Sequence, residues 1–125
     1  MILDTNALSA LLAGDEDLGR VLMPSARHEL PAVVLGEYRY GLVRSRHRAT
    51  LESALARLER EFDLLDVDAS TARVYAGARE RLRAAGTPIP ENDIWIAALA
   101  LQHGLAVVTR DRDFEQVAGL RRVGW

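Results

Sequence analysis

The chain has 125 residues and a formal net charge of -2, with 49% hydrophobic and 27% charged residues, which is typical of a globular protein with its own core. It contains no cysteine, which excludes disulfides and thiolate metal sites, and no apolar run approaches the roughly 20 residues of a membrane span. The near-neutral charge neither supports nor excludes a nucleic-acid partner, and the cytoplasm is the expected compartment.

Short apolar strands alternate with helical segments along the chain, a pattern that is typical of one α/β domain with a parallel sheet. The first half is predicted to contain a strand at 1–3, helices at 6–12 and 17–23, a strand at 31–34, and helices at 35–45 and 48–61. The second half is predicted to contain a strand at 62–67, a helix from 68 or 70 to 86, a helix from 92 or 93 to 103, a strand at 105–109, and a short edge strand at 120–125.

Acidic residues follow apolar strands, or begin the helices after them, at four distant places. These are Asp4, Glu37, Asp93, and the pair Asp111 and Asp113. Because strand ends meet at one edge of a parallel sheet, we expect these acids to form one pocket. Two carboxylates about 4 Å apart repel by roughly 4 kcal/mol at an effective dielectric of 20, so such a cluster requires cations or protons. Hard divalent cations prefer oxygen ligands, and metal-assisted phosphate chemistry is therefore the first hypothesis.

Each acid also has a purely structural interpretation. Asp4 is a candidate helix cap, but Asn6 can cap that helix instead and leave Asp4 free to point into the pocket. Glu37 and Asp93 are each expected in the first turn of a helix, where a negative charge is favourable. The hydroxyl of Thr109 is placed to fix a carboxylate or a metal-bound water.

The fourth acid is either Asp111 or Asp113. We prefer Asp111 because it lies closer to the end of the preceding strand. Asp113 adjoins Phe114, whose ring is expected to pack under the turn and aim Asp113 at local backbone amides.

The basic residues are all arginines, and two groups of them form candidate basic surface, since arginine binds phosphates through two hydrogen bonds. The groups are Arg39, Arg44, Arg46 and Arg48, and Arg79, Arg81 and Arg83. No residue is assigned to nucleic-acid binding. The three histidines have no paired spacing and are not expected to bind metal.

Four motifs together carry a resemblance to a known family. They are Ile2-Leu3-Asp4-Thr5-Asn6; Leu35-Gly36-Glu37 with Tyr40-Gly41-Leu42; Asn92-Asp93 with the apolar run 94–101; and Val108-Thr109-Arg110-Asp111 with Asp113-Phe114. In their order and spacing the sequence resembles the PIN-domain nucleases, and within them the VapC toxins of type II toxin-antitoxin systems, over essentially its whole length. The resemblance implies a three-layer α/β/α sandwich with a central, mainly parallel sheet.

The resemblance also implies an activity and a site. The family members are Mg²⁺- or Mn²⁺-dependent endoribonucleases in which a metal-activated water hydrolyses the RNA phosphodiester. Their acidic quartet maps onto Asp4, Glu37, Asp93 and Asp111, which are the expected catalytic and metal-binding residues. Asn6, Thr109 and Asp113 are the expected supporting residues. A cognate VapB-like antitoxin and a second copy of the chain are the expected protein partners, and no membrane partner is expected.

Competing interpretations are weaker. Phosphotransfer and receiver domains use a lysine at the phosphate, and this chain contains none. A dinucleotide-binding enzyme requires a glycine-rich first turn, which the residues after Asp4 do not provide. The alternative that stays open is a non-catalytic PIN-like module that binds RNA or a protein.

Overall fold

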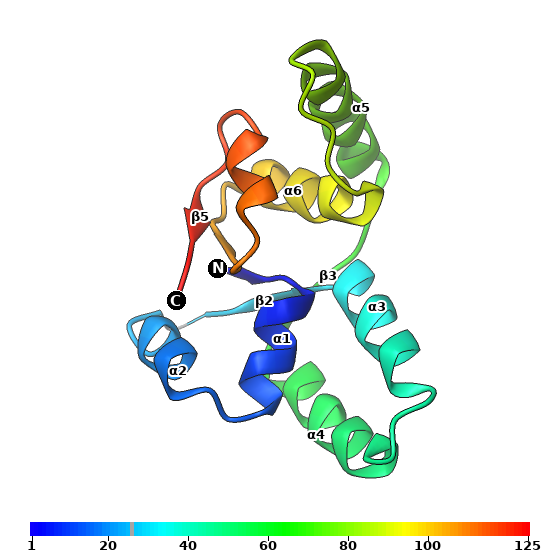
Figure 1. The fold of residues 1–125 in the computed structure, drawn as a ribbon, viewed down its shortest axis with the longest axis vertical. Helices are drawn as coiled ribbons and strands as arrows, with labels where there is room; N and C mark the ends of the chain where they lie inside the picture. Colours follow the sequence, from blue (N-terminus) through cyan, green and yellow to red (C-terminus); the bar gives the residue numbers. More distant parts are fainter. Residues whose placement is uncertain (26) are drawn as a thin grey trace.

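One parallel sheet runs through the computed structural model, which describes residues 1–25 and 27–125 (Figure 1). Its strand order is β3-β2-β1-β4-β5, and every neighbouring pair is parallel. The strands are β1 (Ile2–Leu3), β2 (Glu29–Pro31), β3 (Asp63–Leu65), β4 (Val107–Val108) and β5 (Arg122–Val123).

Helices cover both faces of the sheet, as Figure 1 shows. On one side lie α1 (Thr5–Leu12), α2 (Glu16–Leu22), α3 (Ala32–Leu42) and α4 (Arg48–Glu61), and on the other lie α5 (Ala69–Ala84) and α6 (Glu91–His103). A 3₁₀ helix, η1 (Arg112–Gln116), follows β4. This arrangement confirms the expected three-layer α/β/α architecture. Within residues 1–25 and 27–125, no helix has the length and apolar character needed to cross a membrane.

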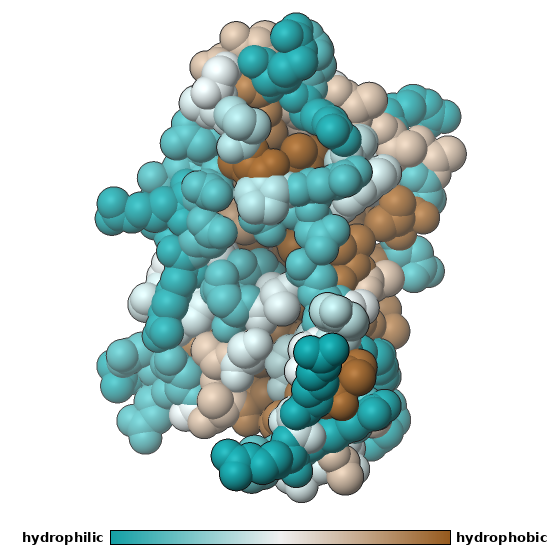
Figure 2. All heavy atoms as spheres, turned by 45° about the vertical axis from the view of Figure 1, so that its right-hand side comes forward, coloured by the Kyte–Doolittle hydropathy of each residue, from teal (hydrophilic) through white to brown (hydrophobic). Residues whose placement is uncertain are grey.

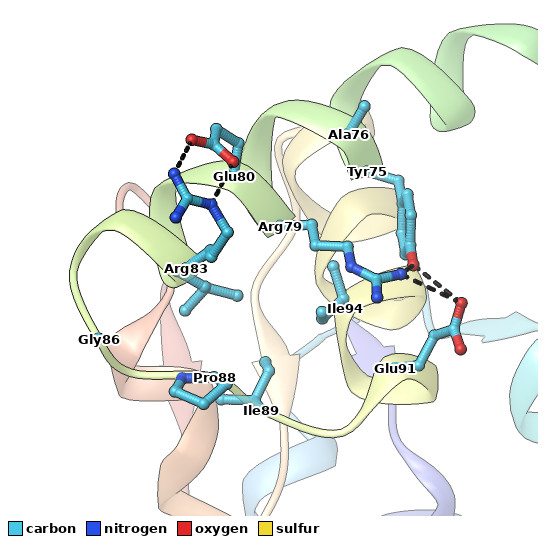
Figure 3. A pocket seen from close by; sticks show the side chains of 11 residues that line it. Tyr75, Ala76, Arg79, Glu80, Arg83, Gly86, Pro88, Ile89, Glu91 and Ile94 are labelled. Atoms are coloured by element: carbon cyan, nitrogen blue, oxygen red, sulfur yellow. Dashed lines mark hydrogen bonds and ion pairs between the residues drawn. The ribbon is translucent and has the colours of Figure 1, made fainter.

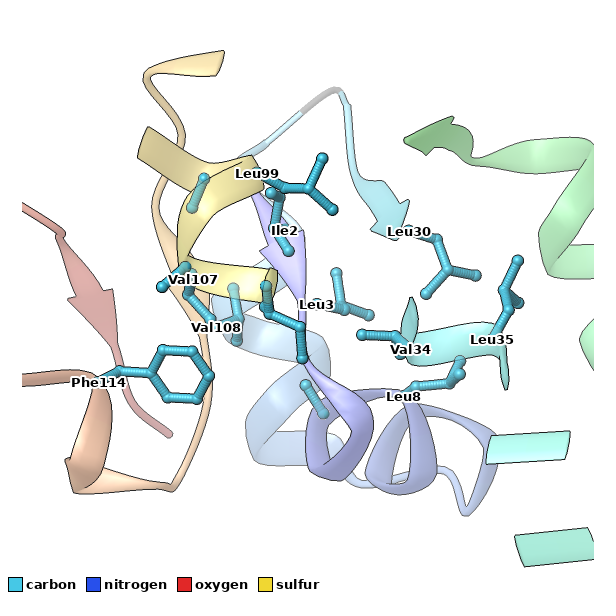
Figure 4. Packing of buried hydrophobic residues seen from close by; sticks show 14 of the residues in the cluster. Ile2, Leu3, Leu8, Leu30, Val34, Leu35, Leu99, Val107, Val108 and Phe114 are labelled. Atoms are coloured by element: carbon cyan, nitrogen blue, oxygen red, sulfur yellow. The ribbon is translucent and has the colours of Figure 1, made fainter. Parts of the chain in front are cut away.

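The two central strands are entirely apolar because helices bury them on both sides. Every residue of β1 and β4 has no exposed surface. Figure 4 shows these strands packed between side chains of α1, α3 and α6, with the ring of Phe114 directed at β4 from η1. Phe114 is fully buried, as expected from the sequence.

The centre of the sheet is also where its strand order reverses. The chain places β2 on one side of β1, and later returns to place β4 on the other side. Leu3 lies opposite Val108 in the β1–β4 pair, so the residues that follow, Asp4 and Thr109, leave the sheet next to each other. Ligands of open α/β sheets bind at such reversal points, beyond the carboxyl ends of the strands.

The strand predicted at 31–34 is wrong. The strand is β2 at Glu29–Pro31, and α3 begins at Ala32. The β-branched pair Val33-Val34 suggested a strand, but Val34, Tyr38 and Leu42 lie on the buried face of a helix at a spacing of four residues. Glu37 is consequently in the second turn of its helix and not in the first.

Candidate active site

Asp4 holds the junction between β1 and α1. Its Oδ1 accepts a hydrogen bond from the backbone N–H of Ala7 at 2.9 Å, so Asp4 caps the helix. Its Oδ2 accepts from the Thr109 hydroxyl at 2.6 Å and from Asn6 Nδ2 at 2.7 Å. The expectation that Asn6 is the cap is therefore wrong, because one carboxylate oxygen is enough for the cap and the other remains available to its neighbours.

Burial changes the acidity of Asp4. Its side chain is almost fully buried, and this desolvation raises its pKa to about 6. The hydrogen bonds from Thr109 and Ala7 oppose the rise in pKa, and the negative charge of Asp111 adds to it. Thr109 has the expected role of fixing a carboxylate, and Asn6 contributes to the same contact.

Glu37 reaches the same place from α3 and is held on both of its oxygens. The Thr5 hydroxyl, on α1, donates to Oε2, and Asn92 Nδ2, on α6, donates to Oε1 at 2.8 Å. Neither Thr5 nor Asn92 was among the predicted site residues. The sequence did offer one indication of their role, because Thr5 directly follows Asp4 and Asn92 directly precedes Asp93, each at the start of a helix.

Asp93 lies in the first turn of α6 and faces the other acids. Burial is the main cause that raises its pKa to about 6, and the charges of Asp111, Glu37, Asp4 and Asp113 add to the rise, in that order. Within the described parts of the chain, no group donates a hydrogen bond to its carboxylate. Among the four acids of the quartet, Asp93 is therefore the one whose carboxylate no hydrogen bond stabilises.

The segment after β4 brings both remaining aspartates to the site. Asp111 is half-buried, lines the acidic pocket, and accepts a hydrogen bond from the Asp113 backbone N–H at 2.8 Å, which caps η1. The prediction that Asp113 binds local amides is wrong, since Asp111 makes that contact while also facing the pocket. One carboxylate oxygen from each of Asp93, Asp111 and the exposed Asp113 lies within 4.8 Å of the others.

All four acids of the predicted quartet line one open hollow of about 340 Å³ at the reversal point of the sheet. The lining residues are Asp4, Thr5, Asn6, Ser9, Glu37, Asp93 and Asp111. Every polar side chain in this set offers oxygen, which suits hard divalent cations, and burial raises the pKa of Asp4 and of Asp93 to about 6. The donor set therefore fits a divalent metal ion.

Most arginines of the two predicted basic groups already have acidic partners. Ion pairs join Arg39 to Glu59 and Arg48 to Glu52 in one group, and Arg79 to Glu91 and Arg83 to Glu80 in the other. Among the described residues, Arg44, Arg46 and Arg81 of these groups form no ion pair. None of the three histidines lines the acidic pocket.

A larger groove, of about 810 Å³, lies between α5, the loop that follows it, and α6. Figure 2 shows apolar side chains exposed in a hollow on this side of the molecule. The close view in Figure 3 shows that its rim charges are occupied, with Glu80 bonded to Arg83, and Arg79 bonded to both Tyr75 and Glu91. The groove has an apolar floor and no converging acids, so we place the candidate active site at the smaller acidic pocket.

Comparison with known proteins identifies the family. The model of the PIN domain matches residues 1–120. Ribonuclease VapC5 of Mycobacterium tuberculosis is 34% identical over 129 residues, covering 98% of this chain and 90% of the relative. The tRNA(fMet)-specific endonuclease VapC of Shigella flexneri is 36% identical over 101 residues, covering 77% of this chain and 74% of the relative.

This chain also resembles a solved structure in fold. The DNA-bound VapBC of Salmonella typhimurium superposes with a TM-score of 0.88 at 28% identity, covering 99% of this chain and 96% of that chain. The match extends across the sheet, both helical layers and the segment that carries Asp111. This chain therefore belongs to the PIN-domain family and, within it, to the VapC ribonucleases.

Proposed function

We propose that this chain is a divalent-metal-dependent endoribonuclease that acts as the toxin of a type II toxin-antitoxin module. The observation that carries the proposal is the convergence of Asp4, Glu37, Asp93 and Asp111 in one open pocket at the reversal point of the sheet. Relatives named as VapC ribonucleases support RNA as the substrate, and solved VapBC complexes support an antitoxin as the partner.

The four acids of the quartet are the proposed catalytic and metal-binding residues, for Mg²⁺ or Mn²⁺. When bound, such an ion favours deprotonation of water and neutralises charge on a phosphate. Asn6 and Thr109 hold Asp4 in place, while Thr5 and Asn92 hold Glu37. Without a cation the clustered carboxylates repel the RNA backbone, so the same residues exclude the substrate until the ion is present.

Asp93 provides the sharpest test, because its carboxylate accepts no hydrogen bond within the described residues and its removal leaves no donor unpaired. Asp93→Asn is expected to keep the fold and abolish cleavage of RNA in the presence of Mg²⁺ or Mn²⁺. The matched control is Glu91→Gln, on the same turn of α6 but facing the groove, which should cleave like wild type. Gel assays on total tRNA with metal or with EDTA measure both.

The proposal fails if wild-type protein cleaves equally well in EDTA, or if Asp93→Asn retains wild-type activity. A protein that binds RNA and Mn²⁺ but never cleaves would instead be a non-catalytic PIN-like module. We also propose that the chain forms a homodimer, as the family resemblance implies. Light scattering of the purified chain and of its complex with the antitoxin tests this separately.

A further inference from the structure

Residue 110 sits between two groups of the candidate active site, yet its side chain points elsewhere. Thr109 directs its hydroxyl to Asp4, and Asp111 lines the acidic pocket. Arg110 lies at a bend between them and is not among the pocket residues. Whatever holds Arg110 therefore fixes the opposite face of the segment that presents Asp111.

Arg110 is held at its side chain by two residues distant in sequence. Its Nη2 donates to Asp15 Oδ2 at 2.8 Å, and its guanidinium carbon lies 4.5 Å from the centre of the Trp125 ring. Trp125 Nε1 donates to the same Asp15 oxygen at 3.3 Å, so the three side chains contact one another in a closed set. A planar guanidinium suits both the stacking and the carboxylate contact.

Asp15 gives this set a rigid base. Its other oxygen, Oδ1, accepts from the Leu18 backbone N–H at 3.0 Å and so caps α2. The backbone N–H of Arg110 donates to Asn6 Oδ1 at 3.1 Å, and Asn6 also binds Asp4. Residue 110 is thus fixed to α1 by its backbone and to the start of α2 by its side chain.

We propose that Arg110, Asp15 and Trp125 form a clamp that positions Asp111 for metal binding, and that Arg110 is not a contact for RNA. The expected effect of the clamp on metal binding and activity rests on the proposed metal-dependent function. Its structural part, that the clamp orders residues 109–113, stands independently and is measurable without metal. The clamp adds positioning residues to the site and ties the turn between α1 and α2 to it.

Metal affinity is the first readout. In Mn²⁺ titrations of the RNA-free protein, Arg110→Gln and Trp125→Ala are each expected to weaken binding by about tenfold, the lower end of the loss when a residue that supports a ligand is removed. Arg112→Gln is the matched control, because it removes an equal charge two residues away, from a side chain with no ion-pair partner in the described residues. Its Mn²⁺ affinity should equal that of wild type.

Two further readouts separate the clamp from other roles. The Asp111 amide N–H donates a hydrogen bond to Thr109, and the Asp113 amide N–H donates one to Asp111. In metal-free protein, hydrogen exchange of these two amides should be faster in Arg110→Gln and Trp125→Ala than in wild type. It should be unchanged in Arg112→Gln. With saturating Mn²⁺, the KM for RNA should stay at the wild-type value in both clamp variants. Arg110→Lys, which keeps the charge but not the planar stack, should give intermediate exchange.

The outcomes are distinguishable. Unchanged amide exchange in Arg110→Gln overturns the clamp, whatever the metal result. A raised KM with unaltered Mn²⁺ affinity also overturns it and makes Arg110 an RNA contact. If wild-type protein binds no Mn²⁺, the proposed function fails, and the exchange data alone decide whether the clamp exists.

Discussion

Asp111 performs two roles that were predicted for two different residues, Asp111 and Asp113. It accepts the amide hydrogen bond that starts η1, and it also lines the pocket with the other acids. Asp113 is exposed and close enough to bind the same metal ion as Asp93 and Asp111, but it does not cap η1. A substitution at residue 111 therefore mixes a loss of charge with a loss of local structure, unless the replacement keeps the acceptor.

Variants at residues 111 and 113 separate these tasks. Asp111→Asn should keep the melting temperature, since its amide oxygen can still accept from Asp113, yet lose RNA cleavage. Asp111→Ala should also lose about 1 kcal/mol of unfolding free energy, as for a removed cap. Asp113→Asn should retain both stability and measurable cleavage. A stable, inactive Asp113→Asn beside an active Asp111→Asn would transfer the catalytic role to Asp113.

Thr5 supplies a second prediction at the level of single residues. Thr5→Val keeps the shape of the side chain but removes the hydrogen bond to Glu37, so the carboxylate can turn away from the site. We expect weaker Mn²⁺ binding and a loss of about 1 kcal/mol of unfolding free energy. Thr5→Ser, which restores the hydroxyl, should bind Mn²⁺ like wild type. Equal Mn²⁺ affinity in both variants would show that Thr5 does not position Glu37.

Among the helices, α5 depends on its first turn because few of its residues are buried. The Asp68 carboxylate accepts a hydrogen bond from the Thr71 backbone N–H at 2.9 Å, and the Thr71 hydroxyl accepts one from the Asp68 backbone N–H. Gln102 on α6 also donates to Asp68, which joins the two helices. The sequence left Asp68 and Ser70 as alternative caps, and the structure selects Asp68.

Asp68→Ala should therefore destabilise the protein by about 1 kcal/mol, which lowers the melting temperature by a few degrees for a chain of this size. Ser70→Ala, the rejected cap, should leave the melting temperature unchanged. Both variants should bind Mn²⁺ with wild-type affinity because neither residue lines the acidic pocket. A larger effect of Ser70→Ala than of Asp68→Ala in thermal unfolding would contradict this assignment.

Elements with a repeating apolar stripe were predictable from sequence, and those set by tertiary contacts were not. The spacing of Leu51, Leu55 and Leu58 gives α4 with its observed bounds of Arg48–Glu61. The start of α3 was misjudged because Val33-Val34 fits a strand locally and is made helical by packing against the core. The 3₁₀ helix η1 was also missed, since it depends on the Asp111 cap and on burial of Phe114.

The site divides in the same way. Its acids were visible because a carboxylate beside an apolar strand requires an explanation, and all four quartet members line the pocket. The donors to Glu37 and the clamp on Arg110 join residues that are far apart in sequence. Such partners depend on the arrangement of the helices, which local patterns do not specify.

For the whole molecule, the raised pKa values of Asp4 and Asp93 predict how stability depends on pH. Both folded pKa values are about 6, above the unfolded value near 3.8, so the metal-free folded state holds more protons between these values. The resulting stabilisation is present below about pH 4 and is lost as the pH rises through about 6. Metal binding requires deprotonated ligands, and so stabilises the protein increasingly over the same range.

Thermal unfolding of wild type and Asp93→Asn at pH 5 and pH 7 measures this linkage. In EDTA, the wild type should lose on the order of 1 kcal/mol more than the variant between pH 5 and pH 7, since the half-exposed Asp93 is partly screened. With saturating Mn²⁺, the wild type should gain more stability than the variant at pH 7. If the stability of the two proteins depends on pH identically in EDTA, the pKa of Asp93 is not raised.

The central position of β1 has a consequence for the order of events during synthesis. β1 emerges first from the ribosome, but its neighbour β4 and the segment that ends at Asp111 come after more than a hundred further residues. At roughly 5–20 residues per second, Asp4 is translated several seconds before the strand that completes its surroundings. A nascent chain that stops before Val107 carries Asp4, Glu37 and Asp93 but cannot build the pocket. Truncated chains that end before β4 are therefore expected to lack the complete acidic pocket and the RNA cleavage proposed for it.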